Sequence, residues 1–148
     1  MGQTLSKVYT HLVFSTKNRE RNIFPEFRDE MYNYMAGILQ NMDSPARCIG
    51  GDMDHVHILF CLSRTKTISE IVRTLKTSTS VWYQNKLGTS FHWQNGYGIF
   101  SIGQSQVDKL INYIKNQEVH HKRKTFKEEL LQILQAYKME YDEKYLWD

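Results

Sequence analysis

The chain has 148 residues, of which 41% are hydrophobic and 13% aromatic, with a net charge of +3. This length predicts one domain spanning residues 1–148, because domains commonly hold about 100–200 residues. The small positive charge permits a nucleic-acid partner without requiring one. No apolar run reaches the roughly 18 residues that a membrane span needs, and the polar residues 1–7 do not resemble a signal peptide, so we expect a cytoplasmic protein with no membrane partner.

Hydrophobic periodicity predicts an alternation of strands and helices. In chain order, we expect a strand at 8–14, a helix at 25–40, strands at 46–51 and from 55, a helix at 67–84, a hairpin of 91–94 with 97–102, and helices at 105–121 and 125–141. Thr67 with Glu70 forms a capping-box pattern, and Asn95-Gly96 is a hairpin signal. This order predicts the α+β class, an antiparallel sheet with helices packed on one face.

The two cysteines, Cys48 and Cys61, do not indicate a disulfide framework in a cytosolic chain of this size. Cys61 shares a strand face with the two histidines considered next, but it lies four residues beyond His57. That spacing is roughly 13 Å along a strand, too far to join one metal ion. We expect both cysteines to act as small hydrophobic side chains.

Two histidines, His55 and His57, lie two residues apart in an apolar, β-favouring run. Alternate residues of a strand point to the same face, so both imidazoles share one face while Val56 and Ile58 share the other. The pair therefore offers two nitrogen ligands to one metal ion from a rigid strand. The alternative is a pair of histidines on a solvent-facing strand with no role, and in both cases we expect that face to be open.

The helix expected at 105–121 carries a second polar group. Tyr113 and Gln117 are spaced i and i+4, so they stack one turn apart on a flank of the apolar stripe. His120 falls on the same flank and His121 lies closer to the stripe. Taken singly, each has an ordinary alternative: a half-buried tyrosine, a solvated glutamine, and a solvated or packed histidine pair.

Together these motifs carry a family resemblance. His55-Val56-His57 resembles the His-hydrophobic-His motif of the HUH single-strand endonucleases, and the stretch 113–117 resembles the tyrosine-plus-glutamine helix of their single-tyrosine transposases. Further similar stretches lie at 11–19, at 93–101 and at 117–121, so that the resemblance spans roughly residues 9–124. Either short motif is weak alone, and the ordered set is specific. Nothing in the last helix carries the resemblance.

The resemblance implies a ferredoxin-like or RRM-like HUH core and a transposase that cuts and rejoins single-stranded DNA. It implies His55, His57 and Gln117 as neutral ligands of one divalent metal, and Tyr113 as the nucleophile that forms a 5′-phosphotyrosine. The resemblance implies Mg²⁺ or Mn²⁺, whereas the softness of two imidazoles favours a later transition metal. No nucleotide cofactor is expected, since the phosphotyrosine conserves the bond energy.

The partners implied are single-stranded DNA with hairpins and a second copy of the chain, whose tyrosine helix can complete the metal site of its neighbour in that family. Several cations are candidates for contact with the DNA backbone, or else ordinary solvated surface. They are Lys17, Arg19, Arg21, Arg73, Lys76, Lys122, Arg123 and Lys124. Trp93, Tyr97 and Phe100 are candidates for base stacking, although core packing is the stronger expectation for them.

Three alternatives remain at this stage. The first is a non-catalytic binder of single-stranded nucleic acid on a ferredoxin-like sheet. The second is a histidine phosphoesterase, which the residues disfavour because His57 is followed by Ile58-Leu59 and no paired His-x-Ser/Thr motif is present. The third is a domesticated member of the same transposase family that cuts host repeats.

Overall fold

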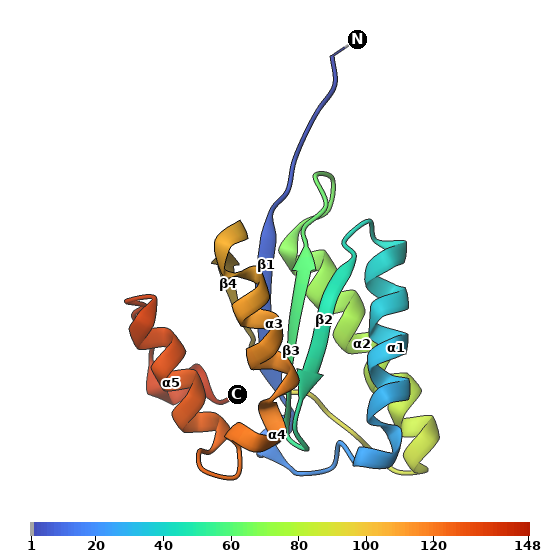
Figure 1. The fold of residues 1–148 in the computed structure, drawn as a ribbon. Coiled ribbons are helices and arrows are strands. Elements are labelled where there is room, and N and C mark those ends of the chain that lie inside the picture. Colours follow the sequence, from blue (N-terminus) through green and yellow to red (C-terminus); the bar gives the residue numbers. More distant parts are fainter. Residues whose placement is uncertain (1) are drawn as a thin grey trace.

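The computed structural model describes residues 2–148 and contains a four-stranded antiparallel sheet in the order β2-β3-β1-β4 (Figure 1). The strands are β1 (Tyr9–Ser15), β2 (Ala46–Gly51), β3 (His55–Cys61) and β4 (Gly98–Ile102). The helices are α1 (Pro25–Asn41), α2 (Ile68–Leu87), α3 (Val107–Lys115), α4 (Gln117–His120), α5 (Phe126–Ala136) and α6 (Glu143–Leu146), with 3-10 turns η1 (Lys17–Arg19) and η2 (Gln104–Gln106). The α+β class with an antiparallel sheet is confirmed.

Helices cover both faces of this sheet, so the expectation of one covered face is wrong. On one face, apolar residues of β1 and β3 such as Phe14 and Ile58 pack against α1 and α2. On the other face, Leu59 packs against α3, and Val13 packs against α5 (Figure 1). The second face is covered because β1 and β3 carry apolar side chains on both of their faces, which only a second layer can bury.

The central pair of strands places the histidines. β1 and β3 pair antiparallel, with Val13 opposite His57 and Ser15 opposite His55. β2 and β3 form the hairpin expected from the sequence, with the two histidines just after its turn. Both central strands are almost wholly buried. Neighbouring side chains therefore hold the two histidines in fixed positions.

The prediction of a hairpin at Asn95-Gly96 is wrong, because residues 91–97 form no strand. Trp93 makes only an isolated bridge, to Thr16. Phe91 and Trp93 are instead buried in the core beside α2, and the backbone N–H of Gly96 donates to the carbonyl of Asp148. The polar backbone of this segment therefore pairs with the end of β1 and with the C-terminus rather than with β4.

The long helix expected at 105–121 is interrupted. Asn116 (φ −99°, ψ 20°) separates α3 from α4, and a 3-10 turn precedes α3. The helix expected at 125–141 is also shorter than expected, because α5 ends at Ala136 and the short helix α6 follows separately. The capping box of Thr67 with Glu70 is present as predicted, and both cysteines are free and partly buried against apolar neighbours. Among residues 2–148, no helix has the length and apolar character to cross a membrane.

Candidate metal and tyrosine site

The paired imidazoles of β3 are fully buried, so the open face expected from the sequence is wrong. His55 and His57 have no exposed surface. The ring of His55 stacks on Phe126 of α5 with 4.6 Å between ring centroids, and α5 closes this part of the sheet. A buried imidazole needs hydrogen-bond partners for both ring nitrogens, and these partners define the site.

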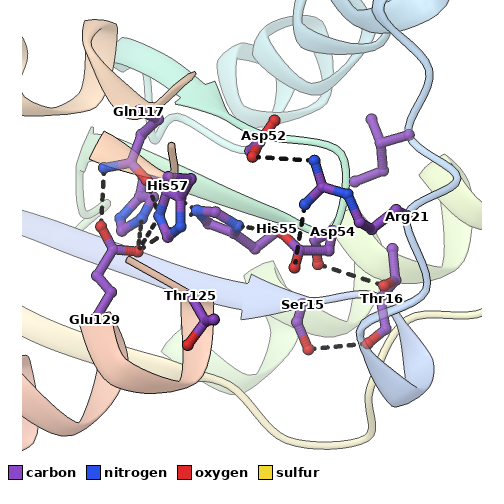
Figure 2. Close-up of polar contacts among 12 residues, drawn as sticks. Ser15, Thr16, Arg21, Asp52, Asp54, His55, His57, Gln117, Thr125 and Glu129 are labelled. Carbon is purple, nitrogen blue, oxygen red and sulfur yellow. Dashed lines mark hydrogen bonds and ion pairs between the residues drawn. The ribbon is translucent and has the colours of Figure 1, made fainter. Parts of the chain in front are cut away.

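Each imidazole is held by a partner on its Nδ1 side. Nδ1 of His55 lies 2.7 Å from Oδ1 of Asp54, and Nδ1 of His57 lies 2.8 Å from Nε2 of His11 on β1. Because Nδ1 is engaged in this way, the Nε2 atoms of both rings point toward α5, where they lie near Oε1 of Glu129. Such outer partners fix the orientation of metal-binding histidines, and Figure 2 shows the contact of His55 with Asp54.

The helical residues reach the imidazole pair from the same chain. Gln117 is buried, and its Oε1 lies 2.8 Å from Nε2 of His55. Tyr113 is half-buried, with its ring 5.8 Å from that of His57, and its hydroxyl donates a hydrogen bond to Glu129. The structure therefore brings together all four residues that the sequence singled out.

Glu129 on α5 was absent from the expected site, and it lies at its centre. Its carboxylate is 1% exposed. Oε1 lies 3.0 Å from Nε2 of His57 and 3.0 Å from Nε2 of His121, while Oε2 accepts from Nε2 of Gln117 at 3.0 Å. The available signal was a carboxylate three residues after Phe126, on the apolar side of an amphipathic helix (Figure 2).

The two histidines after the tyrosine helix have different environments. His121 packs its ring 4.4 Å from that of His55, and its Nε2 lies 3.0 Å from Oε1 of Gln117. His120 stacks on Tyr113 with 4.9 Å between ring centroids. Both histidines therefore lie beside the site. The sequence alone had left open whether they contact it or are solvated.

Burial and the Glu129 charge set the protonation of the site. Burial raises the pKa of the Tyr113 phenol, and the neighbouring carboxylate raises it further, so the hydroxyl is held protonated. Burial also acts to raise the pKa of Glu129, but hydrogen bonds from His121 and His57 outweigh it and hold that pKa well below its usual range. Burial, helped by His57, lowers the pKa of His11 to about 3, which keeps this imidazole neutral.

The donor set fits a divalent metal. The Nε2 atoms of His55 and His57 and the amide group of Gln117 all lie against Glu129, and imidazole nitrogens and amide oxygens bind divalent cations of the first transition row. Ligand atoms of His55, His121 and Glu129 lie within 4.8 Å of one another. The residues present therefore suit the metal that the resemblance implied.

Comparison with known families identifies the family of this chain. The sequence model described as "Transposase IS200 like" matches residues 4–117, which include both histidines, the tyrosine and the glutamine of the site. The chain belongs to the IS200-like transposase family. A comparison with curated proteins finds no significant match.

Solved structures share the fold of this transposase chain. A presumed transposase from Deinococcus radiodurans is 19% identical with a TM-score of 0.64, covering 79% of this chain and 96% of the other. A REP-associated tyrosine transposase bound to a REP hairpin is 14% identical with a TM-score of 0.61, covering 82% and 73%. At these identities the likeness extends to the HUH-type fold alone.

The cations expected to contact DNA fall into two groups around this transposase fold. Arg19, Arg21 and Lys124 line a cavity of about 380 Å³ that Asp54 and His121 of the site also border. Arg21 is exposed and forms ion pairs with Asp52 and Asp54 at 3.5 and 3.9 Å. Lys17, Lys122 and Arg123 are exposed.

The second group lies beside α2. Arg73 and Lys76 line a cavity of about 370 Å³ together with His92 and Tyr97. Lys76 is half-buried, and its Nζ donates to the carbonyls of residues 94, 95 and 96 at 2.6, 3.2 and 2.9 Å. The ammonium group of Lys76 therefore holds residues 94–96, which precede β4, against α2. Of the aromatic candidates for stacking, Trp93 and Phe100 are buried in the core, as expected, and Tyr97 is exposed.

Proposed function

We propose that this chain is a single-strand DNA transposase that cuts and rejoins the ends of a mobile element through Tyr113. The observation that carries the proposal is that one chain brings a phenol hydroxyl beside a buried imidazole pair and Gln117. His55, His57 and Gln117 would hold Mg²⁺ or Mn²⁺. When bound, such an ion orients a phosphodiester and offsets its charge.

In this mechanism Tyr113 attacks phosphorus. A bond forms between the phenolic oxygen and phosphorus, and the bond from phosphorus to the 3′ oxygen breaks, leaving a 5′-phosphotyrosine and a 3′ hydroxyl. In net terms the phenolic proton passes to the departing oxygen, and Glu129, which accepts the hydrogen bond of Tyr113, would orient the hydroxyl for the attack. A phenol, with a pKa of about 10, leaves readily when another 3′ hydroxyl attacks.

Two cavities at the edge of the buried site would receive a DNA strand. One, of about 340 Å³, is bordered by Tyr113 and His11, with Lys109 on its lining. The other is the basic cavity bordered by Asp54 and His121. Single-stranded DNA carrying hairpins is the proposed substrate, and the hairpin in the structure of the REP-associated relative supports this choice. Because that substrate is cellular DNA, a cytoplasmic location belongs to the same proposal.

The assembly and the biological role are part of the proposal. A homodimer would supply one tyrosine for each of two ends, each tyrosine acting at the site of its own chain. The alternative role is that of a domesticated relative cutting host repeats, for which the REP-associated structure is the supporting likeness.

The deciding experiment is incubation with 5′- and 3′-labelled hairpin DNA and Mn²⁺, followed by denaturing electrophoresis. We expect a protein-linked product with the wild-type chain, none with Tyr113→Phe, and an unchanged yield with the control Tyr145→Phe, since Tyr145 is 60% exposed. Hairpin binding should persist in Tyr113→Phe. A wild-type chain that binds hairpins without any adduct would indicate the non-catalytic binder instead.

A further inference from the structure

We propose that Glu129 is a metal ligand, so that α5 adds a carboxylate to the neutral set implied by the family resemblance. The inference rests on the proposed metal site and concerns which residues form it. It assigns a function to an element that carried no motif in the sequence.

The distances around Glu129 are those of neighbouring ligands. An octahedral ion with bonds of roughly 2.0–2.1 Å has adjacent ligand atoms roughly 2.9 Å apart. Oε1 of Glu129 lies 3.0 Å from Nε2 of His57 and 3.5 Å from Nε2 of His55. Two of the ligands proposed above, Nε2 of His55 and Oε1 of Gln117, are separated by 2.8 Å. The carboxylate oxygen is therefore spaced like these proposed ligands.

The other carboxylate oxygen is committed elsewhere. Oε2 accepts hydrogen bonds from Tyr113 and Gln117. Oε1 of Glu129 thus faces the imidazoles of His55, His57 and His121, while Oε2 holds the tyrosine hydroxyl and the amide in place. Glu129 would act as a positioning residue for Tyr113 and as a ligand at once.

A carboxylate also changes which metal the site prefers. Two imidazoles alone favour later transition metals, whereas carboxylate and carbonyl oxygens favour Mg²⁺ and Mn²⁺. Glu129 with Gln117 gives two oxygen donors beside two nitrogen donors. The site then keeps one net positive charge with a divalent ion, and this charge remains available to a phosphate.

The test is the Mn²⁺ affinity of the full chain without DNA, measured by electron paramagnetic resonance titration. Glu129→Gln should weaken binding by at least the roughly 10- to 100-fold that loss of an outer partner costs. Glu128→Gln, one residue earlier and exposed, should match the wild type. His57→Ala reports on the proposed metal site itself and should also lose affinity.

The outcomes separate the two proposals. If His57→Ala weakens binding and Glu129→Gln leaves it unchanged, Glu129 is no ligand and only this inference fails. If Glu129→Gln binds Mn²⁺ more tightly than the wild type, the carboxylate competes with the metal for the imidazole nitrogens, and the inference is again overturned. If His57→Ala has no effect, the metal site of the proposed function fails as well.

A second measurement needs no variant. Infrared difference spectra of the wild-type chain should show a shifted carboxylate band when Mn²⁺ is added, because coordination changes the carboxylate stretch. Carboxylate bands that do not respond to saturating Mn²⁺ would overturn the assignment even if Glu129→Gln proved unable to fold.

Discussion

Single residues at the site carry both stability and chemistry. His57 is completely buried and contacts His11 through Nδ1 and Glu129 through Nε2. Removing its ring leaves Nε2 of the buried His11 without its partner and takes one of several hydrogen bonds from Glu129, and a buried group without a partner costs about 1–3 kcal/mol. The imidazole is therefore part of the fold as well as part of the proposed metal site.

We expect His57→Ala to lower the free energy of unfolding by about 1–3 kcal/mol, in addition to abolishing metal-dependent cleavage. Urea denaturation in EDTA measures the first effect without any contribution from bound metal. His92→Ala is the control, because His92 is exposed, and surface changes are usually within about 0.5 kcal/mol. Equal stability of the two variants would show that the buried imidazole network contributes nothing to folding.

Asp54 would act on the proposed metal through His55. Its Oδ1 lies 2.7 Å from Nδ1 of that histidine, and hydrogen bonding from His55 together with the charge of Arg21 outweighs burial and lowers the pKa of Asp54. Asp54→Ala should weaken Mn²⁺ binding roughly 10- to 100-fold by releasing the ring, as measured by titration. Asp29→Ala, an exposed acidic residue on α1, should leave affinity unchanged. An Asp54→Ala affinity equal to the wild type would rule out this orienting role.

At this scale the sequence predicted types of residue better than their surroundings. Strand and helix periods placed His55 with His57, and Tyr113 with Gln117, on one side of their elements, and the resemblance of the ordered set to a known family singled these residues out. Burial of the histidine face could not be foreseen, since it depends on α5 folding back across the sheet. For the same reason Glu129, which no local spacing links to the motifs, was missed.

Among the elements, α3 is positioned by its close approach to β2. A Cβ atom added to Gly50 would lie 2.5 Å from the carbonyl oxygen of Ile114 and 2.8 Å from its Cγ2. Gly50 pairs with His57 in the sheet, and Ile114 follows Tyr113. The missing side chain therefore lets the tyrosine helix reach the imidazoles.

We expect Gly50→Ala to push α3 away from the sheet, costing about 1–3 kcal/mol as overpacked cores do, and to reduce adduct yield. Gly37→Ala is the matched control: it lies in α1 with open space around it, and alanine there should stabilise the helix by up to about 1 kcal/mol. Thermal denaturation and the adduct gel measure both variants. A Gly50→Ala chain with normal stability and yield would mean that α3 has room to move.

Two expected elements, the hairpin at Asn95-Gly96 and the continuous helix at 105–121, were wrong because local sequence patterns do not include tertiary packing. Asn95-Gly96 favours a tight turn, but Phe91 and Trp93 bury their rings in the core, and Lys76 caps the carbonyls around the turn. Tertiary burial thus outweighed the turn signal. The break at Asn116 has no clear signal in the periodicity, because apolar residues continue on both sides of it.

For the whole molecule, the second helical layer brings Tyr113, Gln117 and the histidine pair together within one chain. Tyr113 contacts Glu129 of α5, and α4 is fastened to α1 by the ion pair of Glu118 with Arg28, a side chain that is 7% exposed. Antiparallel sheet and helix order were predictable from periodicity alone. β1 carries apolar residues on both of its faces, such as Phe14 on one and Val13 on the other. This pattern indicates helices on both faces of the sheet, whereas from the sequence we expected them on one.

This arrangement predicts that each chain acts with its own tyrosine. A mixture of His57→Ala and Tyr113→Phe chains, unfolded and refolded together to allow exchange, should form no DNA adduct in Mn²⁺, because every site lacks either an imidazole or the nucleophile. A swapped dimer would behave differently, since the tyrosine of one variant would meet the intact histidines of the other and restore labelled product. Wild-type chain taken through the same refolding must regain its adduct yield for the comparison to hold. Restored adduct in the mixture would overturn the in-chain assignment while leaving Tyr113 as the nucleophile.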